Sequence, residues 1–142
     1  MRKQIIETKI SEILDDLSIV KENLPDEKEE FIQLGLIKDG MYKKIEFCIQ
    51  NLYDICSIIN TDLKIGIPEG DEIIIDNLIE KKVFNKQLGG KLKQMKGFRN
   101  ILVHRYGKIN DSLAYEVLKH NLDDFYDIIE RIESFVNEFN EE

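Results

Sequence analysis

The sequence predicts an all-α protein, an up-and-down bundle of four to five helices joined by short loops. Apolar residues recur at steps of three and four along most of the 142-residue chain, which is the spacing of one face of an α-helix. Strand signals are nearly absent, because the isoleucines at 73–75 lie between helix-forming residues. The length suits a single hydrophobic core, so we expect residues 1–142 to form one domain.

The expected elements of the first half follow the apolar pattern and its breaks. A helix is expected from about Arg2 to Leu24, and Pro25 ends it. A second helical pattern runs from about Asp26 to Asn60, with a disturbance near Gly35 or Gly40. Glycine is the residue that most often interrupts such a pattern.

The second half opens with a loop at residues 66–70, which contains two glycines and a proline. A short helix is expected from Asp71 to Lys82, another from about Asn85 to Tyr106, and a last one from about Asp111 to Phe139. The wide apolar stripes of the longer helices indicate a contact with a partner chain in addition to the core. We therefore expect a dimer.

The composition, with 42% apolar and 34% charged residues, is that of a globular protein. The apolar runs are far shorter than a membrane span, and the N-terminus lacks the pattern of a signal peptide. We therefore expect a cytoplasmic protein with no membrane association. Cys48 and Cys56 share a helix face with no histidine nearby, which predicts buried free thiols rather than a zinc site.

The charge is unevenly distributed along the chain. The net charge is −8, yet residues 81–110 contain nine lysines and arginines and no acidic residue. A local basic field of this kind can attract phosphate groups even on an acidic protein. A solvated helix face explains the lysines alone equally well.

One short run, from Phe98 to Gly107, combines four polar functions at the end of the basic stretch: Arg99, Asn100, His104 and Tyr106. Arginine can bind a phosphate through two parallel hydrogen bonds, and histidine can transfer protons near neutral pH. Asn100 lies four residues before His104, so on a helix the two are neighbours and the amide can orient the imidazole.

The expected directions of these side chains on the helix differ. At about 100° per residue, Arg99 and His104 point roughly 140° apart, whereas Arg99 and Tyr106 share a face. One helix therefore does not aim its arginine and histidine at one point. Two such helices related by a two-fold axis can do so together, which again indicates a dimer with a composite site.

The run from Phe98 to Gly107 resembles the signature of HEPN-superfamily ribonucleases, and the tyrosine two residues after the histidine resembles the HepT toxin subgroup. The resemblance implies a helical, dimeric ribonuclease that cuts RNA without a metal or cofactor, with Arg99, Asn100 and His104 as catalytic residues. It also implies a partner, a nucleotidyltransferase antitoxin of the MntA type, that attaches AMP to Tyr106 and so silences the toxin.

The chemistry expected of this site is attack of a ribose 2′-OH on the adjacent phosphate, which leaves a 2′,3′-cyclic phosphate. His104 transfers the proton and Arg99 stabilises the charge on the phosphoryl oxygens. We expect Lys93, Lys96 and Arg105 to contact the RNA. Since DNA lacks the 2′-OH, it is expected to be inert.

Two other interpretations remain open. A non-catalytic HEPN module can partner a nucleotidyltransferase or bind nucleotides, and a plain helical dimerisation protein leaves the basic stretch unexplained. Among the remaining polar residues, His120 is expected at the surface, and Glu46 and Asp54 are either partners of Arg99 or surface residues. The other tyrosines fit half-buried helix faces, at positions 42, 53, 115 and 126.

Overall fold

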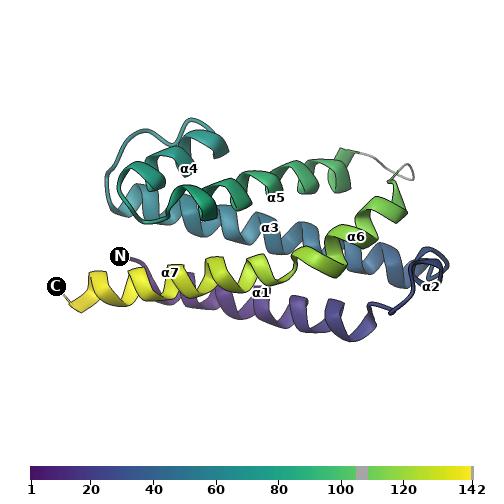
Figure 1. The fold of residues 1–142 in the computed structure, drawn as a ribbon. Helices are drawn as coiled ribbons and strands as arrows, with labels where there is room; N and C mark the ends of the chain where they lie inside the picture. Colours follow the sequence, from purple (N-terminus) through teal and green to yellow (C-terminus); the bar gives the residue numbers. More distant parts are fainter. Residues whose placement is uncertain (105–108, 142) are drawn as a thin grey trace.

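The computed structural model describes residues 1–104 and 109–141, and all its regular elements within these ranges are α-helices (Figure 1). In chain order they are α1 (Lys3–Asn23), α2 (Lys28–Ile32), α3 (Leu36–Asp62), α4 (Asp71–Glu80), α5 (Lys86–His104), α6 (Asp111–Asn121) and α7 (Asp123–Glu141). The all-α prediction is confirmed. No helix in the described ranges is long and apolar enough to cross a membrane.

The long helices reverse direction at each connection, as expected of an up-and-down bundle (Figure 1). Helix α3 packs against α1, α4 and α5, and α7 packs against α5. Helix α2 is a short connection between α1 and α3, and α4 is a short connection between α3 and α5. The described part of the chain has seven helices rather than four to five, because two of the expected helices are each divided in two.

The first division lies where the sequence showed a disturbance. Gly35 has a φ of +59°, in the left-handed region that glycine adopts without steric cost. This conformation ends the turn after α2 and sets the start of α3. Gly40, the other candidate for the disturbance, lies inside α3.

The second division was not predicted: the helix expected from Asp111 to Phe139 is broken at Leu122. Leu122 keeps helical dihedral angles and a buried side chain, so the break is a bend rather than a loop. Asp123 and Asp124 form the first turn of α7, where negative charge is favourable to the helix dipole. The bend lets α6 pack against α2 while α7 packs against α5.

The core is continuous and mostly aliphatic, and α3 contributes the longest buried stripe. Tyr42, Tyr53 and Tyr115 are buried rather than half-buried as expected. Each phenol finds an acceptor, as buried hydroxyls require. Tyr53 donates to the carbonyl of Leu92 at 2.6 Å, Tyr42 donates to Asp111 at 2.6 Å, and Tyr115 donates to the carbonyl of Pro25 at 2.7 Å.

The two cysteines are free and buried, as predicted. Burial raises the pKa of the Cys48 thiol to about 12 and also raises the pKa of Cys56. Both thiols therefore stay protonated at neutral pH and act as small apolar side chains.

Helices α4 and α5 approach each other closely at Gly89. A Cβ atom at this position would overlap the side chain of Ile79 on α4. The neighbouring Gly90 has open space around it. The first glycine is therefore required by packing, whereas the second is not.

We predict that Gly89→Ala lowers the free energy of unfolding by about 1–3 kcal/mol, because the new methyl group overpacks the α4–α5 contact. Gly90→Ala is the matched control, and we expect it to raise stability by up to about 1 kcal/mol, because alanine is the better helix former. Urea denaturation measures both values. Equal effects of the two substitutions would contradict the close approach of α4 and α5.

Candidate active site

The predicted motif lies at the C-terminal end of α5. Arg99 and Asn100 are inside the helix and His104 is its last residue, whereas Arg105 and Tyr106 lie outside the described residues. The predicted helix over this segment is thus confirmed as far as His104.

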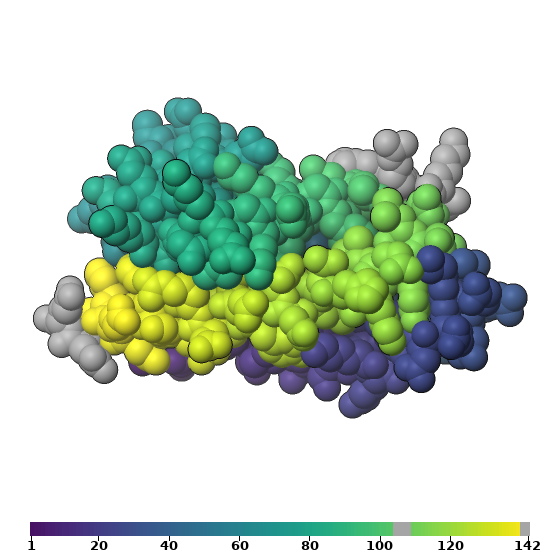
Figure 2. All heavy atoms as spheres, viewed as in Figure 1, coloured from purple at the N-terminus to yellow at the C-terminus, as the bar shows by residue number. Residues whose placement is uncertain are grey.

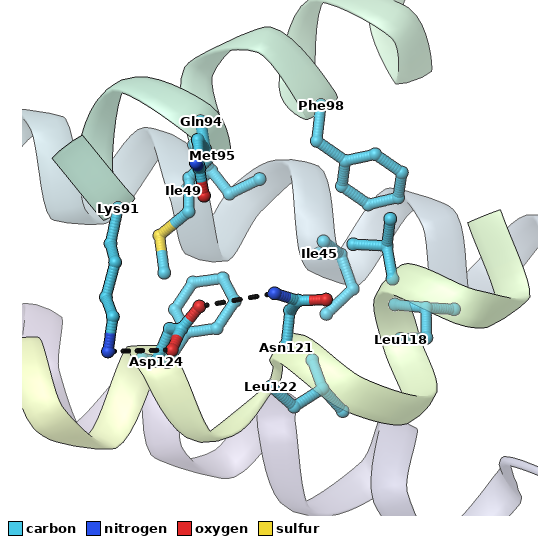
Figure 3. A pocket seen from close by; sticks show the side chains of 12 residues that line it. Ile45, Ile49, Lys91, Gln94, Met95, Phe98, Leu118, Asn121, Leu122 and Asp124 are labelled. Carbon is cyan, nitrogen blue, oxygen red and sulfur yellow. Dashed lines mark hydrogen bonds and ion pairs between the residues drawn. The ribbon is translucent and has the colours of Figure 1, made fainter. Parts of the chain in front are cut away.

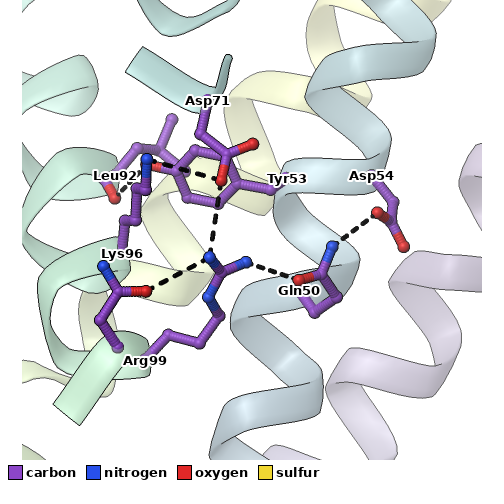
Figure 4. A network of polar contacts seen from close by, with 8 residues as sticks. Gln50, Tyr53, Asp54, Asp71, Leu92, Lys96 and Arg99 are labelled. Atoms are coloured by element: carbon purple, nitrogen blue, oxygen red, sulfur yellow. Dashed lines mark hydrogen bonds and ion pairs between the residues drawn. The ribbon is translucent and has the colours of Figure 1, made fainter. Parts of the chain in front are cut away.

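The guanidinium of Arg99 lies in a network of polar contacts between α3, α4 and α5 (Figure 4). Its Nη1 donates to Oε1 of Gln50 at 2.5 Å, and its Nη2 donates to Oδ1 of Asn100 at 3.4 Å. Nη2 also lies 3.6 Å from a carboxylate oxygen of Asp71, and the side chain of Arg99 is 16% exposed. Arg99 is therefore held on two sides while part of it stays open to solvent.

The partners of Arg99 are themselves fixed by neighbouring charges. Gln50 donates its amide to Asp54, which lies one turn later on α3, at 2.9 Å. Asp54 is also 3.6 Å from Nζ of Lys9 on α1. Asp71, the first residue of α4, is 3.7 Å from Nζ of Lys96 as well. Residues of α3, α4 and α5 thus contact Arg99 directly, and Lys9 of α1 joins the network through Asp54.

The sequence left open whether Glu46 and Asp54 are partners of Arg99 or surface residues, and neither carboxylate contacts Arg99 directly. Glu46 pairs with Lys43 on its own helix at 3.3 Å, while Asp54 reaches Arg99 only through Gln50. Gln50 lies midway between the two, so the helical spacing pointed to its position. A neutral amide carries no charge signal in the sequence, so Gln50 was missed.

Asp71 was also missed, and no sequence signal indicated it. It lies 28 residues before Arg99 and begins a helix after the loop at 66–70. Only the packing of α4 against α5 brings its carboxylate to the arginine.

Several cations of the basic stretch pair with carboxylates of other helices, although residues 81–110 themselves contain no acidic residue. Lys91 pairs with Asp124 and Asp127 of α7, at 3.1 and 3.5 Å. Lys93 pairs with Asp76 of α4 at 2.7 Å, and this hydrogen bond raises the pKa of Lys93. The local basic field that the sequence indicates is therefore partly offset at these lysines by carboxylates of α4 and α7.

The assignment of Lys93, Lys96 and Arg105 to RNA binding stays a prediction. Lys93 and Lys96 are paired with carboxylates but remain partly exposed. Surface ion pairs of this kind contribute about 0–1 kcal/mol. Exchanging a carboxylate for an RNA phosphate therefore costs little.

The opposite side of α5 is apolar and hollowed. A cavity of about 140 Å³ lies between α3, α5 and the bend from α6 to α7, with Phe98 on one wall and the Lys91–Asp124 pair on its rim (Figure 3). A shallower groove, lined in part by Ile101 and Leu113, adjoins it. Figure 2 shows the face of the molecule on which α5 lies beside α6 and α7. Consecutive residues thus face different surroundings, because Phe98 lines this cavity whereas Arg99 joins the polar network between α3, α4 and α5.

Two further expectations concern histidine and metal ligands. His120 lies at the surface as predicted, with its side chain 67% exposed and 3.3 Å from Glu116. Within residues 1–104 and 109–141, the structure places no three His, Cys, Asp or Glu side chains together as a candidate metal site.

Residues 13–132 match the family model described as ribonuclease HepT-like. The chain belongs to this family. The resemblance inferred from the motif is thereby confirmed, and most of the chain supports it rather than the motif alone.

Relatives of this HepT-like chain include a curated protein and solved complexes. It is 30% identical to the mRNA nuclease HepT of Shewanella oneidensis over 74% of this chain and 79% of that protein. A crystal structure of a MntA–HepT toxin–antitoxin complex, with a tyrosine-to-alanine substitution, gives a TM-score of 0.83 at 28% identity, covering 92% of this chain and 98% of that one.

A third similar structure is the tri-AMPylated HEPN toxin of Shewanella oneidensis in complex with its MNT antitoxin. Its TM-score is also 0.83 at 28% identity, and the match covers 92% of this chain and 97% of that one. The helical arrangement of this protein is therefore that of the HEPN toxins.

Proposed function

We propose that the protein is an endoribonuclease toxin that cuts RNA without a metal ion, with Arg99, Asn100 and His104 as its catalytic residues. The observation that carries the proposal is the placement of Arg99. Its guanidinium is hydrogen-bonded to Gln50 of α3 and Asn100 of α5, and the side chain is still partly exposed. Arg99 lies five residues before His104 on the same helix. Membership of the HepT-like family and the mRNA nuclease among its relatives support the same activity.

The proposed reaction is an internal transfer at the RNA phosphate. His104 takes the proton of the ribose 2′-OH, the 2′-oxygen bonds to phosphorus, and the bond to the 5′-oxygen breaks. The imidazolium of His104 returns a proton to the leaving oxygen, which gives a 2′,3′-cyclic phosphate and a 5′-hydroxyl and restores the neutral imidazole. Proton transfer by a positioned histidine is the kind of catalysis that operates near neutral pH.

Arg99 supplies the electrostatic part of the reaction. A guanidinium has five N–H donors, and the hydrogen bonds to Gln50 and Asn100 use two of them. The other donors can bind the phosphoryl oxygens, whose negative charge grows in the transition state. In this mechanism the arginine provides the charge stabilisation that a metal ion provides in other nucleases. Asn100, one turn before His104, orients the imidazole.

The site is proposed to be completed by a second copy of the chain. Arg99 and His104 point about 140° apart on an ideal helix, so a homodimer with facing α5 helices brings the arginine of one copy toward the histidine of the other. Light scattering that finds a fully active monomer would contradict this arrangement.

The proposed partner is a nucleotidyltransferase antitoxin that attaches AMP to Tyr106. The basis is the similar HEPN toxin structure, which is tri-AMPylated and bound to its MNT antitoxin. AMP at this position adds a phosphodiester charge and an adenosine beside the motif, and both compete with RNA for Arg99.

We predict that His104→Ala abolishes RNA cleavage, because the proton acceptor is lost, while the fold is retained, which circular dichroism checks. Arg99→Lys is expected to be severely impaired, because an ammonium does not reproduce the planar fork of arginine. His120→Ala, which removes the exposed histidine, is the matched control and should cleave normally.

The cleavage assay is run in excess EDTA and without it. Retained activity in His104→Ala, or complete loss of wild-type activity in EDTA, would reject the mechanism. Nuclease activity that no motif substitution affects would instead favour the alternative that this chain is a non-catalytic HEPN module and that the activity is a contaminant.

A second prediction concerns the modification. Co-expression with a nucleotidyltransferase antitoxin of the MntA type should increase the intact mass of the protein in AMP-sized steps, and Tyr106→Phe should abolish the increase. Tyr126→Phe, on α7, is the control and should still be modified. If the partner neutralises an unmodified protein, inhibition occurs by binding and not by AMPylation.

A further inference from the structure

The side-chain amide of Gln50 lies between an arginine and a carboxylate. Its Oε1 accepts from Nη1 of Arg99 at 2.5 Å, and its Nε2 donates to Oδ1 of Asp54 at 2.9 Å. An amide has one accepting and one donating end, whereas an ionised carboxylate only accepts and a guanidinium only donates. The reversed amide would place donor against donor and acceptor against acceptor. Only the observed orientation therefore satisfies both neighbours.

We propose that Gln50 and Asp54 are positioning residues for Arg99. Asp54 orients the amide of Gln50, and Gln50 in turn fixes the Nη1 side of the guanidinium, so that the remaining donors of Arg99 face the RNA phosphate. This inference rests on the proposed role of Arg99 in cleavage. It assigns Gln50 and Asp54 no contact with RNA.

The choice of a neutral residue next to Arg99 has a physical consequence. A carboxylate at position 50 would pair with the arginine directly and compete with the phosphate for its charge. The amide holds the side chain in place without adding a second carboxylate to that of Asp71, which lies 3.6 Å from Nη2 of Arg99. The carboxylate of Asp54 is separated from Arg99 by the side chain of Gln50. Its charge is compensated by Lys9, whose Nζ lies 3.6 Å away. A side chain that is fixed in advance loses less entropy when the transition state forms.

The polar contacts from Lys9 to Arg99 connect three helices of the bundle, through the α1–α3 and the α3–α5 contacts. Lys9 belongs to α1, Gln50 and Asp54 to α3, and Arg99 to α5, and α3 packs against both other helices. Gln50 and Asp54 are one turn apart, the spacing at which helical side chains meet. The position of Arg99 is thus set by long-range packing of α3 and not by α5 alone.

The test uses the full-length protein and compares Gln50→Ala, Asp54→Ala, the double variant and Asp54→Asn. Gln50→Ala should lower kcat for an RNA oligonucleotide by roughly tenfold, with KM within about twofold, because orientation and not binding is lost. Asp54→Ala should act in the same direction, and the double variant should be no worse than Gln50→Ala, because Asp54 acts through Gln50. Asp54→Asn should retain activity, since its amide oxygen can still accept from Gln50.

Glu46→Ala is the matched control. Glu46 lies one turn before Gln50 on α3 and pairs with Lys43, so its loss should leave kcat unchanged. Gln50 is exposed and alanine suits a helix, so the variants should fold, which circular dichroism checks. A fully active Gln50→Ala, or additive effects in the double variant, would overturn the inference.

A second measurement does not require cleavage. In ¹⁵N NMR spectra of the RNA-free protein, the Nη–H signals of Arg99 should be separate in the wild type and in Asp54→Asn, and averaged in Gln50→Ala. Arg99→Lys identifies these signals by their loss. If no form of the protein cleaves RNA, the proposed function fails, and the spectra still decide whether Gln50 fixes Arg99. Identical spectra in wild type and Gln50→Ala would reject the positioning role.

Discussion

The packing of α3 sets the positions of the helices around it. One long face of this helix is buried against α1, α4 and α5, and burial of each large aliphatic side chain stabilises the fold by about 1.5–3 kcal/mol. The same helix carries Gln50 and Asp54 on a face that reaches the solvent. Core packing therefore determines where the polar partners of Arg99 lie, and a shift of α3 would change both stability and the site.

Charge in this protein is organised across helices rather than along the chain. Asp71 contacts both Arg99 and Lys96, and Asp76 contacts Lys93. These carboxylates occupy the cations that the proposed reaction assigns to RNA. Because the pairs are partly exposed and individually weak, a phosphate can replace a carboxylate without a large cost. An acidic protein can in this way act on a polyanion.

Local patterns in the sequence predicted what is local in the structure. The periodicity of residues 3–23 and the glycine and proline residues of the loop at 66–70 fixed those elements, because each signal lies within the element itself. The motif on α5 was found for the same reason. Its residues lie within one short segment of the sequence, so their types and spacing can be recognised there. The match to the HepT-like family confirms the resemblance.

What the sequence could not predict depends on contacts between distant segments. The bend at Leu122 follows from packing of α6 and α7 on different helices, and no residue breaks the helical pattern there. Asp71 and the lysine partners on α4 and α7 are brought to α5 only by the fold. Gln50 lies one helical turn from both Glu46 and Asp54, so its position could be inferred from the helical spacing. It was missed because a neutral amide carries no charge.

The chemistry of the RNA ends tests most directly whether Arg99 and His104 cleave RNA through its 2′-OH. The purified protein is incubated in EDTA with an RNA oligonucleotide, and with the same oligonucleotide carrying a 2′-deoxy sugar at the cleavage position, and the products are identified by mass spectrometry. Cleavage by Arg99 and His104 predicts a 2′,3′-cyclic phosphate and a 5′-hydroxyl from the RNA, and no cleavage at the deoxy position. Products with a 3′-hydroxyl and a 5′-phosphate, or cleavage at the deoxy position, would contradict it.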